Sequence, residues 1–147
     1  MLLRSCMHGL VLLLGLAATG LAVERSVAIE APPTTKAGEA CRIVLIASTT
    51  AGQGEQVGLF QADFSTDGGR TWAGLCYLDK LGPETRQERD ITAGPAGSEI
   101  RVRLRVAFRD GLAGDVDYRG AAIRWHAGWE KWQEPPAKSV AIPVVVR

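Results

Sequence analysis

The 147-residue chain contains few of the residues that catalytic and metal sites use most. It has only two histidines, and His8 lies in an apolar stretch at the N-terminus, so His126 is the one histidine in the remainder. A Ser–His–Asp or Cys–His arrangement would have to use His126, which lies in an expected surface loop between two tryptophans. No glycine-rich phosphate loop precedes a helical pattern either. We therefore expect a protein that is not an enzyme and needs no cofactor.

The chain also has no excess charge of either sign. It carries 17 basic and 16 acidic residues, and residues 1–22 hold Arg4 and no acid, so residues 23–147 carry 16 of each. Nucleic acids and anionic membranes bind strongly basic surfaces. A formally neutral domain argues against both as partners.

The N-terminus has the pattern of a secretory signal. Arg4 supplies a positive start, residues 10–23 are apolar and uncharged, and Gly20 and Ala22 suit the small-x-small cleavage rule. We expect a signal peptide over residues 1–22, a single domain over residues 23–147, and a secreted or periplasmic protein that meets the membrane only through its export signal. A retained anchor is the alternative, although the apolar run is shorter than the roughly 20 residues of a spanning helix. A lipoprotein would need a cysteine just after the apolar run. Cys6 lies before the run, so we do not expect lipidation.

Two cysteines, Cys41 and Cys76, remain after the expected cleavage. In an oxidising compartment they can form one disulfide, which would stabilise the fold by roughly 3–4 kcal/mol on the chain-entropy model. The alternative is a pair of buried free thiols.

The pattern of residues 23–147 is that of short strands separated by turns, without a long helical period. We expect an all-β, antiparallel two-sheet sandwich of seven or eight strands. Residues 40–48 are apolar on both faces, which predicts a central strand, and the polar residues 84–92 suit an edge strand. The expected strands are residues 26–31, 40–48, 56–64, 71–78, 84–92, 99–109, 118–125 and 138–146.

The clearest strand pattern covers residues 99–109. Apolar residues alternate there with Arg101, Arg103 and Arg105, as in a strand with one buried face. We expect Glu84, Glu88 and Asp90 to neutralise this arginine row across the sheet. A polyanion site is the alternative.

The most specific motif is a hairpin at residues 65–72. Asp67 can accept hydrogen bonds from amides of its own turn, and Gly68 and Gly69 can take the positive φ angles of tight turns. Trp72 can then fold over the turn and cover it.

This motif resembles the Asp-box, Ser-x-Asp-x-Gly-x-x-Trp, with Ser65, Asp67, Gly69 and Trp72 in its four fixed places. In sialidase propellers the Asp-box is a structural hairpin remote from catalysis, so the resemblance implies no catalytic residue. A propeller also needs several blade repeats, and this chain has one copy.

The hairpin is also similar to a turn of bacterial immunoglobulin-like and fibronectin type III-like domains. The Arg-x-Arg-x-Arg strand and residues 129–136 before the last strand resemble the same class, which implies a sandwich of that type. The connection over residues 110–133 is longer than the class has between its last two strands. Either an additional strand is inserted there, or the assignment of these strands to the sixth and seventh of the class is wrong.

Three tryptophans and three aspartates are candidates for binding. Trp125, Trp129 and Trp132 lie within eight residues and could bind a sugar or a protein, or Trp132 could stack on the arginine row. Asp110, Asp115 and Asp117 could ligate calcium, although aspartates that form turns are the commoner explanation. We expect a non-catalytic module that binds an extracytoplasmic protein. The alternative is a carbohydrate-binding module of an extracellular glycan-degrading system.

Overall fold

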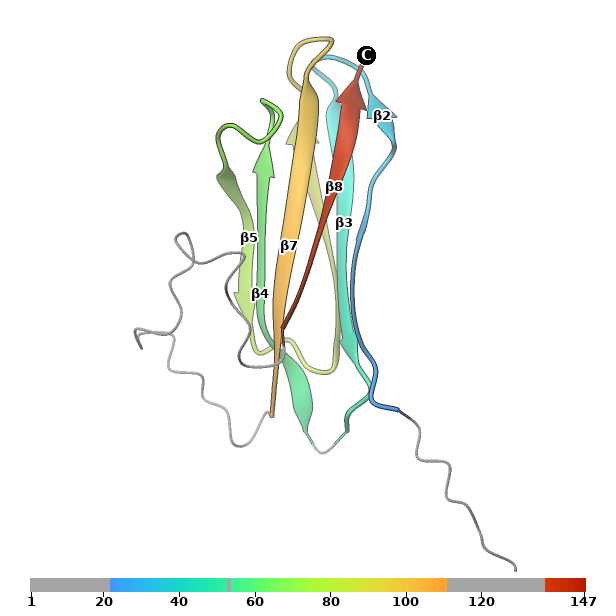
Figure 1. The fold of residues 1–147 in the computed structure, drawn as a ribbon, viewed down its shortest axis with the longest axis vertical. Coiled ribbons are helices and arrows are strands. Elements are labelled where there is room, and N and C mark those ends of the chain that lie inside the picture. The colour runs from blue at the N-terminus through green and yellow to red at the C-terminus, as the bar shows by residue number, and fades with distance from the viewer. Residues whose placement is uncertain (1–21, 53, 111–136) are drawn as a thin grey trace, which may run out of the picture.

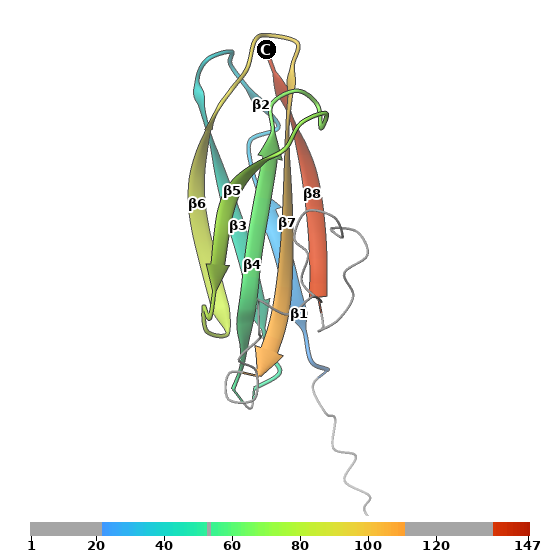
Figure 2. The same cartoon turned by 90° about the vertical axis from the view of Figure 1, so that its left-hand side faces the viewer.

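The computed structural model describes residues 22–52, 54–110 and 137–147, and this part contains eight strands and no helix. The strands form two layers, seen in Figures 1 and 2. A three-stranded sheet has the order β1-β3-β6 and a five-stranded sheet the order β2-β8-β7-β4-β5. This confirms the expected all-β, two-sheet sandwich. The strands are β1 (Arg25–Glu30), β2 (Thr34–Thr35), β3 (Ala40–Thr49), β4 (Glu55–Ser65), β5 (Ala73–Asp79), β6 (Glu84–Thr92), β7 (Glu99–Asp110) and β8 (Ala137–Val146).

The expected strands agree with these bounds to within about two residues at each end. β3 is the central strand of its sheet and β6 is an edge, as the composition of each predicted. The expected strand at residues 118–125 lies outside the described residues. No helix in the described part of the chain is long and apolar enough to cross a membrane.

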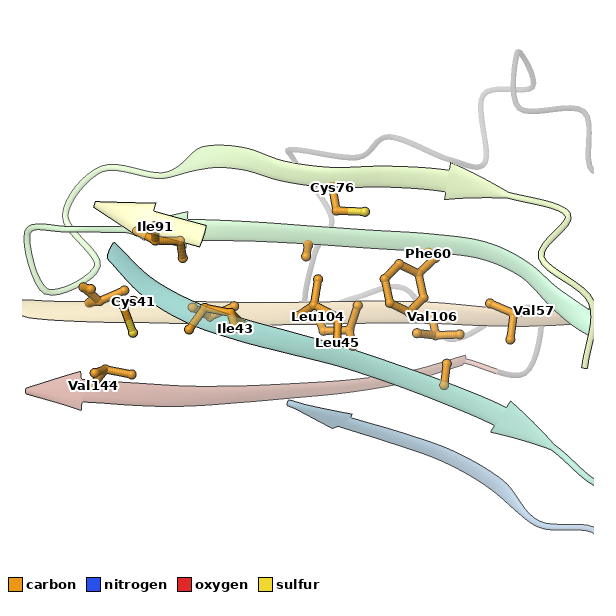
Figure 3. Packing of buried hydrophobic residues seen from close by; sticks show 14 of the residues in the cluster. Cys41, Ile43, Leu45, Val57, Phe60, Cys76, Ile91, Leu104, Val106 and Val144 are labelled. Carbon is orange, nitrogen blue, oxygen red and sulfur yellow. The ribbon is translucent and has the colours of Figure 1, made fainter. Parts of the chain in front are cut away.

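The hydrophobic core lies between the two sheets. The apolar residues of β7, from Ile100 to Phe108, are at most 1% exposed and face the apolar residues of β3, as Figure 3 shows for several of them. Each large aliphatic or aromatic side chain buried in this way contributes about 1.5–3 kcal/mol relative to exposure. The period-two pattern of β7 therefore positions this strand, with Arg101, Arg103 and Arg105 directed away from the core.

All strand pairs are antiparallel except one. Pro32 and Pro33 end β1 and carry the chain to the other sheet, where β2 pairs in parallel with the end of β8. The Pro33 carbonyl accepts a hydrogen bond from the Val145 amide at 3.1 Å. β2 pairs only with Val145 and Val146 at this end of β8. On the side of β8 away from β7, no described strand is therefore paired with Pro143, and such a position tolerates a residue without an N–H.

Candidate functional site

The β4–β5 hairpin is built around Asp67, as predicted. Oδ1 of Asp67 accepts hydrogen bonds from the amides of Arg70 and Thr71 at 3.0 and 2.9 Å, and Oδ2 accepts one from the Thr71 hydroxyl at 2.7 Å. The Ser65 hydroxyl donates to Oδ1 at 2.7 Å. These hydrogen bonds stabilise the ionised carboxylate and lower the pKa of Asp67 well below its ordinary value. The hydrogen bonds from Thr71 contribute most to this lowering.

The two glycines and the tryptophan complete the turn. Gly68 and Gly69 have φ angles of 73° and 92°, in the left-handed region that favours glycine. The Trp72 indole N–H donates to the Gly69 carbonyl at 3.1 Å, so the ring folds back over the turn. The polar side-chain groups of Ser65, Asp67 and Trp72 are thus used inside the hairpin, which indicates a structural role.

Trp72 also contacts the arginine row. The guanidinium carbon of Arg103 lies 4.0 Å from the centroid of the Trp72 ring. A tryptophan stacked on this row was predicted, but for Trp132, which lies outside the described residues. The ring that the structure places there comes from the hairpin.

The expected neutralisation of the arginine row by β6 was wrong. Glu84, Glu88 and Asp90 belong to the three-stranded sheet, where Glu88 and Asp90 pair with Arg42 at 3.6 and 3.0 Å. The arginine row instead finds its partners within its own five-stranded sheet, because β4 lies beside β7.

The partners of the row come from β4 and from β7 itself. Arg103 donates to Asp63 at 3.1 Å, and Arg105 donates to the Gln61 carbonyl oxygen at 3.2 Å. Arg101 pairs with Glu99. Asp63 and Gln61 are only 3% and 4% exposed. The arginines therefore fix a carboxylate and a carboxamide in place on the outer side of the sheet.

The expected disulfide is absent, and the alternative of two buried thiols is what the structure has. Cys41 and Cys76 are both free, and Figure 3 shows them well apart in the core. Cys41 lies at the start of β3, whereas Cys76 lies in the middle of β5 and accepts a hydrogen bond from Arg89 at 3.3 Å. Burial raises the pKa of both thiols, and at Cys76 the charge of Arg89 opposes that rise.

Regular alternation would place Trp72 and Cys76 on the same side of the sheet, and a bulge in β5 is the reason that they lie on opposite sides. Cys76 pairs with Ala62 but Gly74 pairs with Asp63, so Leu75 is an extra residue. One extra residue reverses the alternation of sides. Cys76 therefore points into the core while Trp72 lies outside it.

A pocket of about 520 Å³ lies along β4 and β5, next to this bulge. Gly74 is paired with Asp63 and has no side chain, which leaves part of the space that forms the pocket. Tyr77, paired with Gln61, is 52% exposed. The lining residues are Gln61, Ala62, Asp63, Gly74, Leu75, Cys76 and Tyr77.

The pocket was not among the predicted sites. Alternation along residues 56–64 places Gln61 and Asp63 on the polar face of their strand. The pairing of β5 through a bulge, in contrast, is a tertiary property. Tyr77 gave one usable signal, as an aromatic residue in a strand whose other residues, apart from Asp79, are small or apolar.

Most of the predicted binding residues lie outside the described residues. These are Trp125, Trp129, Trp132, Asp115, Asp117 and His126. Asp110 is the last residue of β7. The described residues contain no group of three His, Cys, Asp or Glu side chains placed to hold a metal ion.

Comparison with known proteins adds no family: no protein-family model matches the chain, and no curated protein matches it.

Proposed function

We propose that this chain is an exported, non-catalytic module of the immunoglobulin-like or fibronectin type III-like class that binds another protein. Leaving the short β2 aside, the first, second and fifth strands form one sheet, and the third, fourth, sixth and seventh form the other. Immunoglobulin-like sandwiches likewise hold the first, second and fifth strands in one sheet and the third, sixth and seventh in the other, and fibronectin type III domains share this architecture. Fold does not fix function, so the binding role needs its own support.

The observation that supports protein binding is the edge formed by β5. This strand is the last of the five-stranded sheet among the described strands, and it lies beside the pocket. Its sequence, Ala-Gly-Leu-Cys-Tyr-Leu-Asp, contains no lysine, arginine or proline. Edge strands usually carry such residues because they discourage pairing with other chains. An edge without them, next to an exposed tyrosine, favours a binding surface.

The test is site-specific cross-linking in the cells that produce the protein. A photoreactive phenylalanine analogue replaces Tyr77 in the full chain, and in a second sample it replaces Ala28, an exposed residue of the opposite sheet's edge strand. We expect a discrete cross-linked protein from position 77 and none from position 28. Equal labelling from the two positions, or none from either, would contradict the proposal.

Carbohydrate binding is the second candidate, and the composition of the pocket supports it. Aromatic rings stack on sugar faces, and the Asp63 carboxylate and Gln61 amide are immobilised beside Tyr77 by Arg103 and Arg105. Its volume also lies within the range of about 300–1,000 Å³ typical of ligand pockets. A glycan array with the wild-type protein and Tyr77→Ala tests this candidate. Binding that is lost in Tyr77→Ala would favour it over a protein partner.

A further inference from the structure

The outer face of the five-stranded sheet, directed away from the three-stranded sheet, carries a buried apolar pair. Leu59 of β4 and Ala107 of β7 lie opposite each other in the strand register and are 0% and 1% exposed. Their chain neighbours Phe60 and Val106 belong to the core cluster between the sheets, whereas Leu59 and Ala107 do not. Because successive side chains of a strand point to opposite faces, these two residues lie on the outer face. We call them the outer pair.

The described strands do not explain the burial of the outer pair. They form two layers, and the three-stranded sheet lies against the inner side of the five-stranded one, as Figure 2 shows. The Trp72 ring does lie on the outer side, but over Arg103. At a rise of about 3.3 Å per residue, Ala107 lies about 13 Å from Arg103 along β7, which is too far for one indole ring to span. A further segment of this chain, or another molecule, therefore packs on the outer pair.

The position of the outer pair in the chain identifies what packs there. We propose that residues 111–136 of the same chain pack on Leu59 and Ala107. This segment connects the end of β7 at Asp110 to the start of β8 at Ala137, and Ala137 pairs with Ala107. Both ends of the segment are thus anchored beside the outer pair.

The length of the segment supports this assignment. A connection between two antiparallel neighbours needs only about two to five residues, and loops longer than about 15 residues are uncommon in compact domains. Residues 111–136 exceed both lengths, so most of the segment is not needed to join β7 to β8. A segment held at both ends also stays at a far higher effective concentration near the outer pair than a free molecule does. These two properties favour the segment over a second copy or a separate partner.

The composition of the segment suits an apolar site. It contains three of the four tryptophans of the chain, Trp125, Trp129 and Trp132. An aromatic ring that packs on an aliphatic side chain removes apolar area of both from water, which is the main source of stability in such contacts. This inference goes beyond the proposed function and does not depend on it, because it concerns a contact within the chain.

The test measures nuclear Overhauser contacts in the purified full chain, with the methyl groups of leucine, alanine and valine isotopically labelled. We expect contacts from the methyl groups of Leu59 and Ala107 to a tryptophan ring within residues 111–136. Replacing each tryptophan of the chain by phenylalanine, one at a time, assigns the ring signals. Val145 lies on the same face beyond the arginine row and is 47% exposed, so its methyl groups are the control and should show no contact with the segment.

A pair of variants gives a second readout. Leu59→Ala should raise the equilibrium constant for unfolding by about thirtyfold or more, because it leaves a cavity under a covered site. It should also make the tryptophans more accessible to acrylamide, seen as stronger quenching of their fluorescence in the folded protein. Val145→Ala, on the exposed part of the face, should change neither quantity. The contacts in the wild type decide the question if Leu59→Ala fails to fold.

Three results would overturn the inference. One is the absence of contacts between the outer pair and a tryptophan of the segment in the wild type. Another is contacts that appear only between labelled and unlabelled molecules in a mixture, since these would assign the outer pair to a second copy. The third is an equal effect of Leu59→Ala and Val145→Ala on unfolding and quenching, which would show that Leu59 is not covered. Cross-linking at residue 77 tests the proposed function separately from all three.

Discussion

Arg103 lies with its guanidinium 4.0 Å from the centroid of the Trp72 ring and also donates to Asp63 at 3.1 Å. One side chain of β7 thereby joins the hairpin to the polar face of β4. A cation over an indole face contributes about 0.5–1 kcal/mol at exposed sites and more where water is excluded. The hairpin is therefore coupled to the sheet as well as to its own turn.

Trp72→Ala should destabilise the protein by about 2 kcal/mol, because it removes this contact together with the ring's cover over the turn. Trp72→Phe retains a ring but lacks the N–H that donates to Gly69, and we expect it to lose about half as much. Urea denaturation followed by circular dichroism gives both values. Equal stability of Trp72→Ala and the wild type would show that the hairpin holds without its tryptophan.

Asp67 should make the stability depend on pH in the acid range. Its folded pKa is lowered from an ordinary value of 3.8, so its contribution is fully present above that value and is lost as the pH falls through the lower folded pKa. Asp67→Asn should be less stable than the wild type at neutral pH. Below pH 3.8 the two should converge. Urea midpoints measured across the acid range test this, and parallel curves would contradict the role of the carboxylate.

The turn of the hairpin could be predicted from sequence because the side-chain hydrogen bonds that shape it lie within a few residues. Ser65, Asp67 and Thr71 bind one another and the amides between them, so no other strand is needed. The buried face of β7 could also be predicted from sequence, because the alternation of apolar and polar residues is a property of a single strand. Both predictions agree with the structure.

The partners of Arg103 could not be predicted in this way. Its pairing with Asp63 requires β4 to lie beside β7, and strand order depends on how distant segments assemble. The bulge at Leu75 is similar, because it is defined only by the residues that β4 places opposite β5. The pocket depends on both the pairing of β4 with β7 and the bulge in β5. The sequence therefore predicts on which face of a strand a residue such as Asp63 lies, but not that the residues form a pocket.

Asp63 and Arg103 form an ion pair in which the two side chains are 4% and 18% exposed. Removing one partner of a buried pair leaves a desolvated charge and typically costs about 3–5 kcal/mol. We expect Asp63→Ala to cost about 3 kcal/mol, and the double variant with Arg103→Ala to cost less than the sum of the single variants. Asp90→Ala, which breaks the exposed pair with Arg42, is the control and should change stability little. Additive effects at Asp63 and Arg103 would contradict the coupling.

The two cysteines should react only when the protein unfolds. Both are buried and free, and burial raises the pKa of each thiol, which lowers the fraction of reactive thiolate. An alkylating reagent at neutral pH should label neither Cys41 nor Cys76 in the native protein and both in denaturant. Reductant should leave the urea midpoint unchanged. A midpoint that falls in reductant would show a bridge that the structure does not contain.

Arg25 and Glu55 connect the first strand to the start of β4 through two hydrogen bonds of 2.7 Å, and Thr49 adds a third to the carboxylate at 2.6 Å. The hydrogen bond from Arg25 is the main reason that the pKa of Glu55 is lowered from its ordinary value of 4.5. The stabilisation is therefore present above pH 4.5 and is lost as the pH falls through the folded pKa.

Glu55→Gln should cost about 1 kcal/mol at neutral pH, a modest value because Arg25 is 29% exposed and partly screened by water. This loss of stability should be confined to β1. Among the described strands β1 lies at the edge of its sheet and pairs with β3 alone, so its amides should exchange faster while those of β7 do not. Hydrogen exchange measured by NMR distinguishes this from a general loss of stability. Uniformly faster exchange in both strands would show that the Arg25–Glu55 pair supports the whole sandwich instead of its first strand.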